Sequence, residues 1–150
     1  MISETEGNVL HAKEDMLIHG CNCFNTWGAG IALKIKNIYP LAYQTDSVTL
    51  SGDKNKLGKF TYWKGLHRLY EQSITVINLY TQYGYGVDIQ HADYDAIENG
   101  LLSVKKSFPD NSIAMPKIGS GLGGGDWAKI KKIIENVFND ISDVVNIYYL

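Results

Sequence analysis

A run of glycines between an apolar segment and an amphipathic segment is the feature that most limits how this chain can fold. Five of the seven residues 119–125 are glycine, a third of the 15 glycines in the chain. A glycine inside a helix or strand costs about 0.5–1 kcal/mol relative to alanine, so such a run is expected only in a loop that needs it. The run follows a short apolar segment at 112–115 and precedes Asp126, a residue type that caps helix N-termini. We therefore expect a strand, a glycine loop and a helix in that order.

Alternation of strands and helices along the whole chain places this loop in an α/β fold. Short apolar or alternating runs predict strands, and apolar residues spaced by three and four predict helices. Because 150 residues suffice for one core, we expect a single domain over residues 1–150, a mixed, mostly parallel sheet with helices on both faces in three layers. The predicted strands are 1–6, 16–19, 59–64, 74–80, 112–115 and 144–149; the predicted helices are 31–39, 41–50, 94–108 and 126–141, the last burying Ile130, Ile133, Ile134, Val137, Phe138 and Ile141.

Charge, hydropathy and cysteine content argue against several classes of protein. The 14 Lys and Arg residues lie in separate short clusters and the formal net charge is -2, so we expect no sequence-specific nucleic-acid binding. No apolar run approaches the roughly 20 residues that cross a bilayer and no signal peptide opens the chain, so we expect no membrane association and a cytoplasmic location. Cys21 and Cys23 are expected to be free thiols without further metal ligands nearby. We expect a monomer with no metal and no cofactor.

The glycines of residues 119–125 favour a site for an anion. Glycine lets the backbone adopt positive φ and lets a ligand approach closely, so successive N–H groups can hold a phosphate beside the positive end of the next helix. A flexible connection is the alternative, although about two to six residues usually join a strand to a helix. The run is neither a P-loop, since no Lys-Ser or Lys-Thr follows, nor a dinucleotide-binding fingerprint, which belongs in the first strand–helix–strand unit.

The loop at residues 20–30 carries groups suited to a sugar-phosphate ligand. Asn22 and Asn25 offer amide donors and acceptors for sugar hydroxyls. The segment 28–30, Gly-Ala-Gly, precedes a helix N-terminus and suits a phosphate, and Trp27 offers a flat apolar wall. For any one of these residues, packing of Trp27 in the core or capping of a turn by an asparagine is an equal alternative.

Three motifs, taken together, resemble one known family. The first covers His19-Gly20-Cys21-Asn22-Cys23 and Trp27-Gly28-Ala29-Gly30-Ile31-Ala32, the second covers residues 115–124 followed by Trp127, and the third is Glu6-Gly7-Asn8-Val9. They resemble the two ligand loops and the adenine-side signature of macro domains, which bind ADP-ribose. The similarity runs in the right order from about residue 6 to residue 138 and is closest to the branch of the yeast-type ADP-ribose 1''-phosphate phosphatase.

The resemblance implies a three-layer macro domain that binds ADP-ribose or ADP-ribose 1''-phosphate. Adenine would lie beside Asn8 and Val9, and the distal ribose beside Asn22. Tyr83 and Tyr85, in the loop at 81–88, would wall the adenosine or the distal ribose. The diphosphate would lie between Gly28, Ala29, Gly30 and Ile31 on one side and Ser120, Gly121, Leu122, Gly123 and Gly124 on the other.

Two positions depart from the pattern of the family. Asn8 stands where many members have Asp, so a bond to the amino group of adenine would lack the charge. Leu122 is followed by three glycines where many members have an aromatic residue. That end of the pocket is expected to be more open, with room for a bulky 1'' substituent.

Hydrolysis needs a water, a base and stabilised charge, and two titratable side chains lie next to the loops. His19 ends the strand that enters the first loop, and Asp126 ends the second loop. If both face the distal ribose, one would activate water and the other would protonate the departing oxygen. A buried core histidine and a plain helix cap are the alternatives. His11, His67 and His91 have no motif around them and are expected at the surface.

Three functions are compatible with these motifs. The first is hydrolysis of ADP-ribose 1''-phosphate to ADP-ribose and phosphate. The second is removal of ADP-ribose from modified protein or nucleic acid, and the third is binding of ADP-ribose without catalysis. The fold alone does not separate them.

Overall fold

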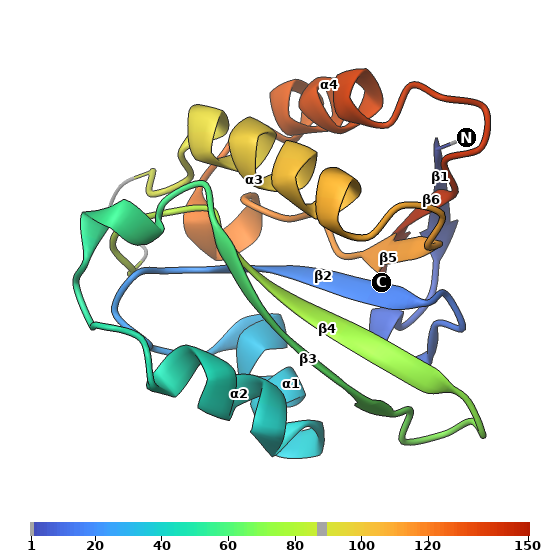
Figure 1. The fold of residues 1–150 in the computed structure, drawn as a ribbon. Coiled ribbons are helices and arrows are strands. Elements are labelled where there is room, and N and C mark those ends of the chain that lie inside the picture. The colour runs from blue at the N-terminus through green and yellow to red at the C-terminus, as the bar shows by residue number, and fades with distance from the viewer. Residues whose placement is uncertain (1, 87–89) are drawn as a thin grey trace.

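In the computed structural model, which describes residues 2–86 and 90–150, the chain forms a six-stranded sheet with helices on both faces (Figure 1). The strands are β1 (Ile2–Glu6), β2 (Met16–Cys21), β3 (Phe60–Leu66), β4 (Ser73–Tyr80), β5 (Ile113–Met115) and β6 (Val145–Tyr149). The α-helices are α1 (Gly30–Ile38), α2 (Pro40–Ser47), α3 (Tyr94–Ser107) and α4 (Trp127–Val137). Three short 3₁₀ helices are η1 (Val9–His11), η2 (Lys54–Lys56) and η3 (Gly121–Gly123).

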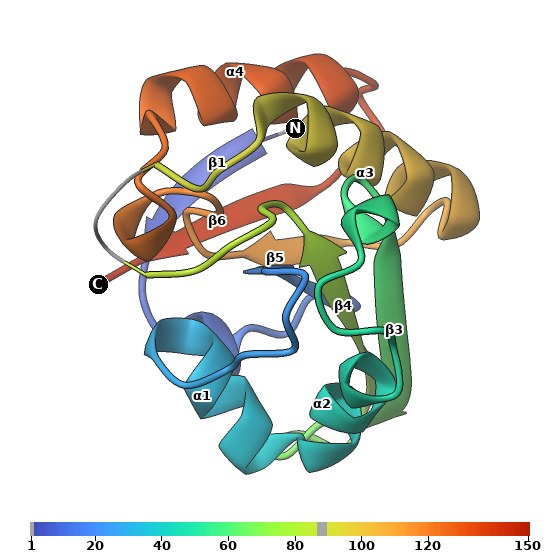
Figure 2. The same cartoon turned by 90° about the vertical axis from the view of Figure 1, so that its left-hand side faces the viewer.

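The strand order is β1-β6-β5-β2-β4-β3. Every neighbouring pair is parallel except β3 and β4, which are antiparallel. Helices α3 and α4 cover one face and α1 and α2 cover the other, as Figures 1 and 2 show from two sides. The predicted mixed, mostly parallel sheet between two helical layers is therefore confirmed. Because β2, β4 and β5 run the same way, their carboxyl ends meet at one edge.

Strand β2 lies inside the sheet and is buried on both faces, as its apolar sequence predicts. Met16 and Ile18 pack with the core under α3 and α4, whereas Leu17 and Cys21 pack with the core under α1 and α2. This alternation fixes which side of the strand each residue occupies. His19 shares its face with Leu17 and Cys21, so it points toward α1 and α2.

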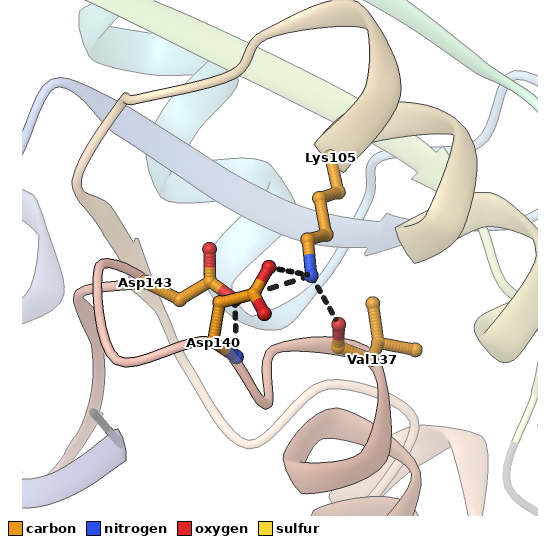
Figure 3. Close-up of polar contacts among 4 residues, drawn as sticks. All are labelled: Lys105, Val137, Asp140 and Asp143. Atoms are coloured by element: carbon orange, nitrogen blue, oxygen red, sulfur yellow. Dashed lines mark hydrogen bonds and ion pairs between the residues drawn. The ribbon is translucent and has the colours of Figure 1, made fainter.

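The predicted last helix ends earlier than expected, and the expected burial of Ile141 is wrong. Helix α4 stops at Val137, and Ile141 is 95% exposed in the following turn. Lys105 of α3 explains the stop, because its ammonium donates to the carbonyl oxygen of Val137 at 2.9 Å (Figure 3). The same ammonium pairs with Asp140 at 3.3 Å and Asp143 at 3.2 Å, which holds the turn against α3.

His67 is a second correction, since the structure buries it where we expected a surface residue. Its Nε2 lies 3.1 Å from the carbonyl oxygen of Ala12, and its Nδ1 accepts the N–H of Leu69 at 3.0 Å. Tyr39 and Tyr70 contact its ring. His67 therefore connects the end of β3 to the segment before β2. No motif accompanies it because both bonds go to backbone atoms.

Candidate functional site

A pocket of about 500 Å³ lies where the carboxyl ends of β2, β4 and β5 meet. This is the edge at which open α/β sheets bind ligands, and the volume is typical of a small-molecule site. Three loops line it, one after each of the three strands. The lining residues are 20–22, 26–32, 81–82, 85–86, 116–120 and 122–123.

The N-terminus of α1 supplies backbone donors to the pocket. Ala29, the residue before the helix, makes no side-chain hydrogen bond to its first turn. The first residues of the helix, 30–32, line the pocket. Since the first N–H groups of a helix have no partner within it, they are available to an anion here.

Gly28 keeps the space in front of this helix end open. A Cβ atom added at Gly28 would meet no heavy atom within 4 Å. Gly28 has no positive φ, so its backbone conformation does not require glycine. A larger side chain at this position would therefore enter the pocket.

The second loop has a defined internal structure. Gly125 donates its N–H to the carbonyl oxygen of Gly119 at 2.8 Å, which closes the loop on itself. Between these two residues the chain turns through η3, which begins without a side-chain cap. A Cβ atom at Gly125 would lie 2.6 Å from the oxygen of Gly119, so this glycine is required by packing. The glycine run thus forms a closed turn beside the pocket.

The two glycine loops face each other across the pocket. A Cβ atom at Gly30 would lie 3.5 Å from Cδ1 of Leu122, which places the start of α1 next to η3. The start of α4, by contrast, is capped by Asp126, whose Oδ1 accepts the N–H of Ala128 at 3.0 Å. Asp126 is not among the described residues that line the pocket. The positive helix end that reaches the pocket is that of α1, and not that of α4.

The structure brings together some of the predicted ligand residues. Nine of them line the pocket: Asn22, Trp27, Gly28, Ala29, Gly30, Ile31, Ser120, Leu122 and Gly123. The other six are not among the described lining residues: Asn8, Val9, Asn25, Tyr83, Gly121 and Gly124. Residues 87–89, at the end of the loop expected to wall the ligand, lie outside the described part of the chain.

Several of these six side chains have other partners. Asn8 caps η1 by accepting the N–H of Leu10 at 3.0 Å. Asn25 accepts the ammonium of Lys56 at 2.9 Å. Tyr83 donates its hydroxyl to the carbonyl oxygen of Gly52 at 2.9 Å. These contacts hold the loops in place around the pocket.

His19 is completely buried behind the first loop and is not part of the described pocket lining. Its Nε2 donates to Oδ1 of Asn78 at 2.8 Å, and its ring lies edge-on to that of Trp27 at 4.7 Å. Burial lowers the pKa of His19 to about 4, so the ring is neutral near pH 7. The structure does not bring His19 and Asp126 together on the pocket surface.

Sequence reasoning missed the residues that directly follow β4. Thr81 and Gln82 line the pocket together with the two glycine loops. The signal was available, because residues at the carboxyl ends of neighbouring parallel strands share one edge of the sheet. Lys117, inside the quoted second motif, also lines the pocket, and its ammonium lies over the rings of Trp127 and Tyr149.

The titratable groups of the described lining are Cys21, Tyr85 and Lys117. Burial, and then the charge of Asp46, raise the pKa of Cys21 well above its usual range, so it is a thiol and a weak nucleophile. Both cysteines are free and buried. Within residues 2–86 and 90–150 there is no group of three or more His, Cys, Asp or Glu side chains placed to hold a metal. No helix in the same ranges is long and apolar enough to span a membrane.

The fold and the site define an α/β domain with a pocket at the carboxyl edge of a mostly parallel sheet, lined in part by the uncapped start of a helix. The family model "Macro domain" matches residues 18–134. The chain belongs to the macro domain family, as its motifs predicted.

Individual relatives carry different names. The chain is 32% identical over 142 residues to an "Uncharacterized 17.5 kDa protein in tk-vs intergenic region" of Enterobacteria phage T4, covering 91% of this chain and 88% of that protein. It is 27% identical over 150 residues to a "DNA ADP-ribosyl glycohydrolase" of Mycobacterium tuberculosis, covering 99% of this chain but 42% of that protein. It is 27% identical, over an alignment of 172 positions, to the "ADP-ribose 1''-phosphate phosphatase" of Saccharomyces cerevisiae. This alignment covers 96% of this chain and 97% of that protein.

Proposed function

We propose that this chain binds ADP-ribose in the pocket and hydrolyses ADP-ribose 1''-phosphate to ADP-ribose and phosphate. The observation that carries the proposal is the uncapped start of α1 beside η3, which offers backbone N–H groups to a diphosphate from two sides. A pocket of about 500 Å³ suits a ligand of this size. The diphosphate would lie along residues 28–31 and 120–123.

Relatives with two different enzymatic names match this chain at the same identity. The "ADP-ribose 1''-phosphate phosphatase" of yeast and the mycobacterial "DNA ADP-ribosyl glycohydrolase" are each 27% identical to it. We place the phosphatase reaction first because the ligand-loop motifs resemble that branch of the family.

The chemistry that we propose rests on charge stabilisation. The described lining contains no carboxylate and no imidazole, so backbone N–H groups are its means of stabilising the departing phosphate. Gln82 has an amide that can orient a water in the pocket. A catalytic role for His19 and Asp126 stays a prediction, and their positions favour packing and capping.

Removal of ADP-ribose from nucleic acid is the second candidate, because aromatic side chains gather at the pocket rim. Tyr85 lines the pocket and is 56% exposed. Its ring lies 5.9 Å from that of Phe24, which in turn lies 4.8 Å from that of Tyr83. Lys54 lies over the ring of Tyr83 at 4.9 Å. Such a rim suits the stacking of a base next to a modified nucleotide.

Two turnover assays and one binding assay separate the candidates. We would measure phosphate release from ADP-ribose 1''-phosphate, ADP-ribose release from ADP-ribosylated single-stranded DNA, and ADP-ribose binding by calorimetry. Turnover of the first substrate supports the proposal, and turnover of the second alone supports the second candidate. Binding with no turnover of either substrate would leave an ADP-ribose reader. Absence of ADP-ribose binding would overturn the ligand assignment itself.

A further inference from the structure

Residues 28–30, which we call the cradle because the diphosphate would lie against them, make few contacts with the rest of the fold. All three residues are exposed, and a Cβ at Gly28 would touch nothing within 4 Å. The residue before the cradle, Trp27, is almost completely buried, with 3% of its surface exposed. The position of the cradle therefore depends on how firmly Trp27 is held.

Trp27 is held by a buried carboxylate on another element. Its Nε1 donates to Oδ2 of Asp46, in α2, at 2.9 Å. Asp46 is completely buried and does not line the pocket in the described part of the chain. A hydrogen bond in a buried site of low dielectric is stronger than the same bond in water.

The other carboxylate oxygen of Asp46 makes a second hydrogen bond, which can be compared with the bond to Trp27. Oδ1 accepts the hydroxyl of Tyr80, in β4, at 2.6 Å. Burial, and then this bond to Asp46, raise the pKa of Tyr80, so the phenol stays protonated and remains the donor. One carboxylate thus makes two bonds, one to the anchor of the cradle and one to the sheet. The first bond reaches the residue before the exposed cradle, whereas the second reaches a strand that its own backbone pairing with β2 and β3 already holds in place.

We infer that Asp46 is a positioning residue for the ligand site, which fixes the N–H groups of residues 28–30 by holding the indole of Trp27. The inference rests on the proposed function, because it concerns the same diphosphate. Asp46 touches no ligand, and its effect passes through Trp27. A displacement of the cradle by a fraction of an ångström would lengthen every N–H bond to the phosphates.

The test compares three variants that break chosen bonds of this carboxylate. Trp27→Phe removes the bond between Asp46 and Trp27, whereas Asp46→Ala removes both bonds of the carboxylate. We expect each of these variants to weaken ADP-ribose binding about 10-fold. Tyr80→Phe breaks only the bond to the sheet and keeps wild-type affinity, although its thermal stability falls. The double variant Asp46→Ala/Trp27→Phe binds no more weakly than Trp27→Phe alone, since the bond between the two residues is already absent in Trp27→Phe.

A spectroscopic readout separates positioning from a general loss of structure. In ¹H–¹⁵N spectra, Asp46→Ala should shift or broaden the amide signals of Gly28 and Gly30, whereas those of Gly119 and Gly125 stay in place. Tyr80→Phe should leave the signals of Gly28 and Gly30 unchanged.

Several results would overturn the inference. They are wild-type affinity in folded Asp46→Ala, equal losses of affinity in Tyr80→Phe and Trp27→Phe, or additive losses of affinity in the double variant. If Asp46→Ala does not fold, the comparison of Trp27→Phe with Tyr80→Phe still decides. A wild-type protein that does not bind ADP-ribose would instead refute the proposed function.

Discussion

Burial determines what His19 can do, because an imidazole removed from water is held in its neutral form. The ring donates to Asn78, packs edge-on against Trp27 and is not itself part of the described pocket lining. A neutral ring that already donates to a buried amide is poorly placed to exchange protons with a substrate. We therefore expect His19 to contribute to the free energy of unfolding and to the position of the Trp27 ring.

Stability should depend on pH through His19. Its pKa is 6.5 when unfolded and about 4 in the fold, so between these values the unfolded chain binds more protons. The stabilisation is complete above the unfolded pKa and is lost as the pH falls through the folded pKa. From His19 alone we expect the free energy of unfolding to fall by about 2 kcal/mol between about pH 7.5 and about pH 5, measured by urea unfolding.

His19→Gln provides the matched control, because its amide N–H can replace the donor to Asn78 and does not titrate. The pH dependence of the variant should be flatter than that of the wild type by that amount. If the free energy of unfolding depends on pH equally in the variant and the wild type, the buried, neutral state of His19 is contradicted. A folded variant that binds ADP-ribose but has lost turnover would restore the catalytic prediction.

For individual residues, the sequence predicted which residues line the pocket better than it predicted the contacts of their side chains. Gly28, Ala29 and Ser120 are read from the motifs because they act through backbone atoms next to them in the chain. The partners of Asn25 and Trp27, which are Lys56 and Asp46, lie 31 and 19 residues away. No local pattern identifies such partners, since only the folded chain brings them together.

Among the elements, the glycines of the two loops have different physical reasons to be glycine. A Cβ at Gly28 would meet only open space, whereas a Cβ at Gly125 would overlap the backbone of Gly119. We therefore predict that glycine serves binding in the first loop and folding in the second.

Two substitutions should separate these reasons. Gly28→Val should keep the free energy of unfolding within about 0.5 kcal/mol of wild type, because no atom opposes the side chain, and it should abolish measurable ADP-ribose binding. Gly125→Ala should destabilise the fold by about 1–3 kcal/mol, because its Cβ would overlap the oxygen of Gly119. Urea unfolding and calorimetry on both variants check this, and a folded Gly28→Val that still binds would contradict it.

The elements themselves were largely predictable. Periodicity located all six strands and four helices, and Pro40 ended one helix and began the next, as a proline at a first helical position can. The end of α4 was missed because it depends on Lys105 from α3, which no pattern within α4 announces. The 3₁₀ turn inside the glycine run was missed because glycines carry no periodicity.

On the scale of the whole molecule, the pocket is a joint product of three loops that only the folded sheet brings together. A ligand held by all three stabilises the folded state and has no comparable site in the unfolded chain. Binding should therefore be visible as global stabilisation.

ADP-ribose at 100 times its Kd should add about 2.7 kcal/mol to the free energy of unfolding. For a domain of this size we expect Tm to rise by about 5–10 °C, measured by calorimetry. Gly28→Val should show no shift under the same conditions. If ribose alone raised Tm by the same amount, the phosphates would not be the groups that the pocket recognises.

The pairing of β1 with β6 joins the first strand to the last. On the ribosome, β1 emerges early but has no partner until β6 has been made, a delay of roughly 7–28 s at ~5–20 residues per second. An apolar strand waiting that long would invite other nascent chains to pair with it. The sequence of β1 is Ile-Ser-Glu-Thr-Glu, mostly polar and exposed even in the finished fold. We expect its acidic side chains to keep the unpaired strand soluble during synthesis, before Glu4 pairs with Lys131 in the finished fold.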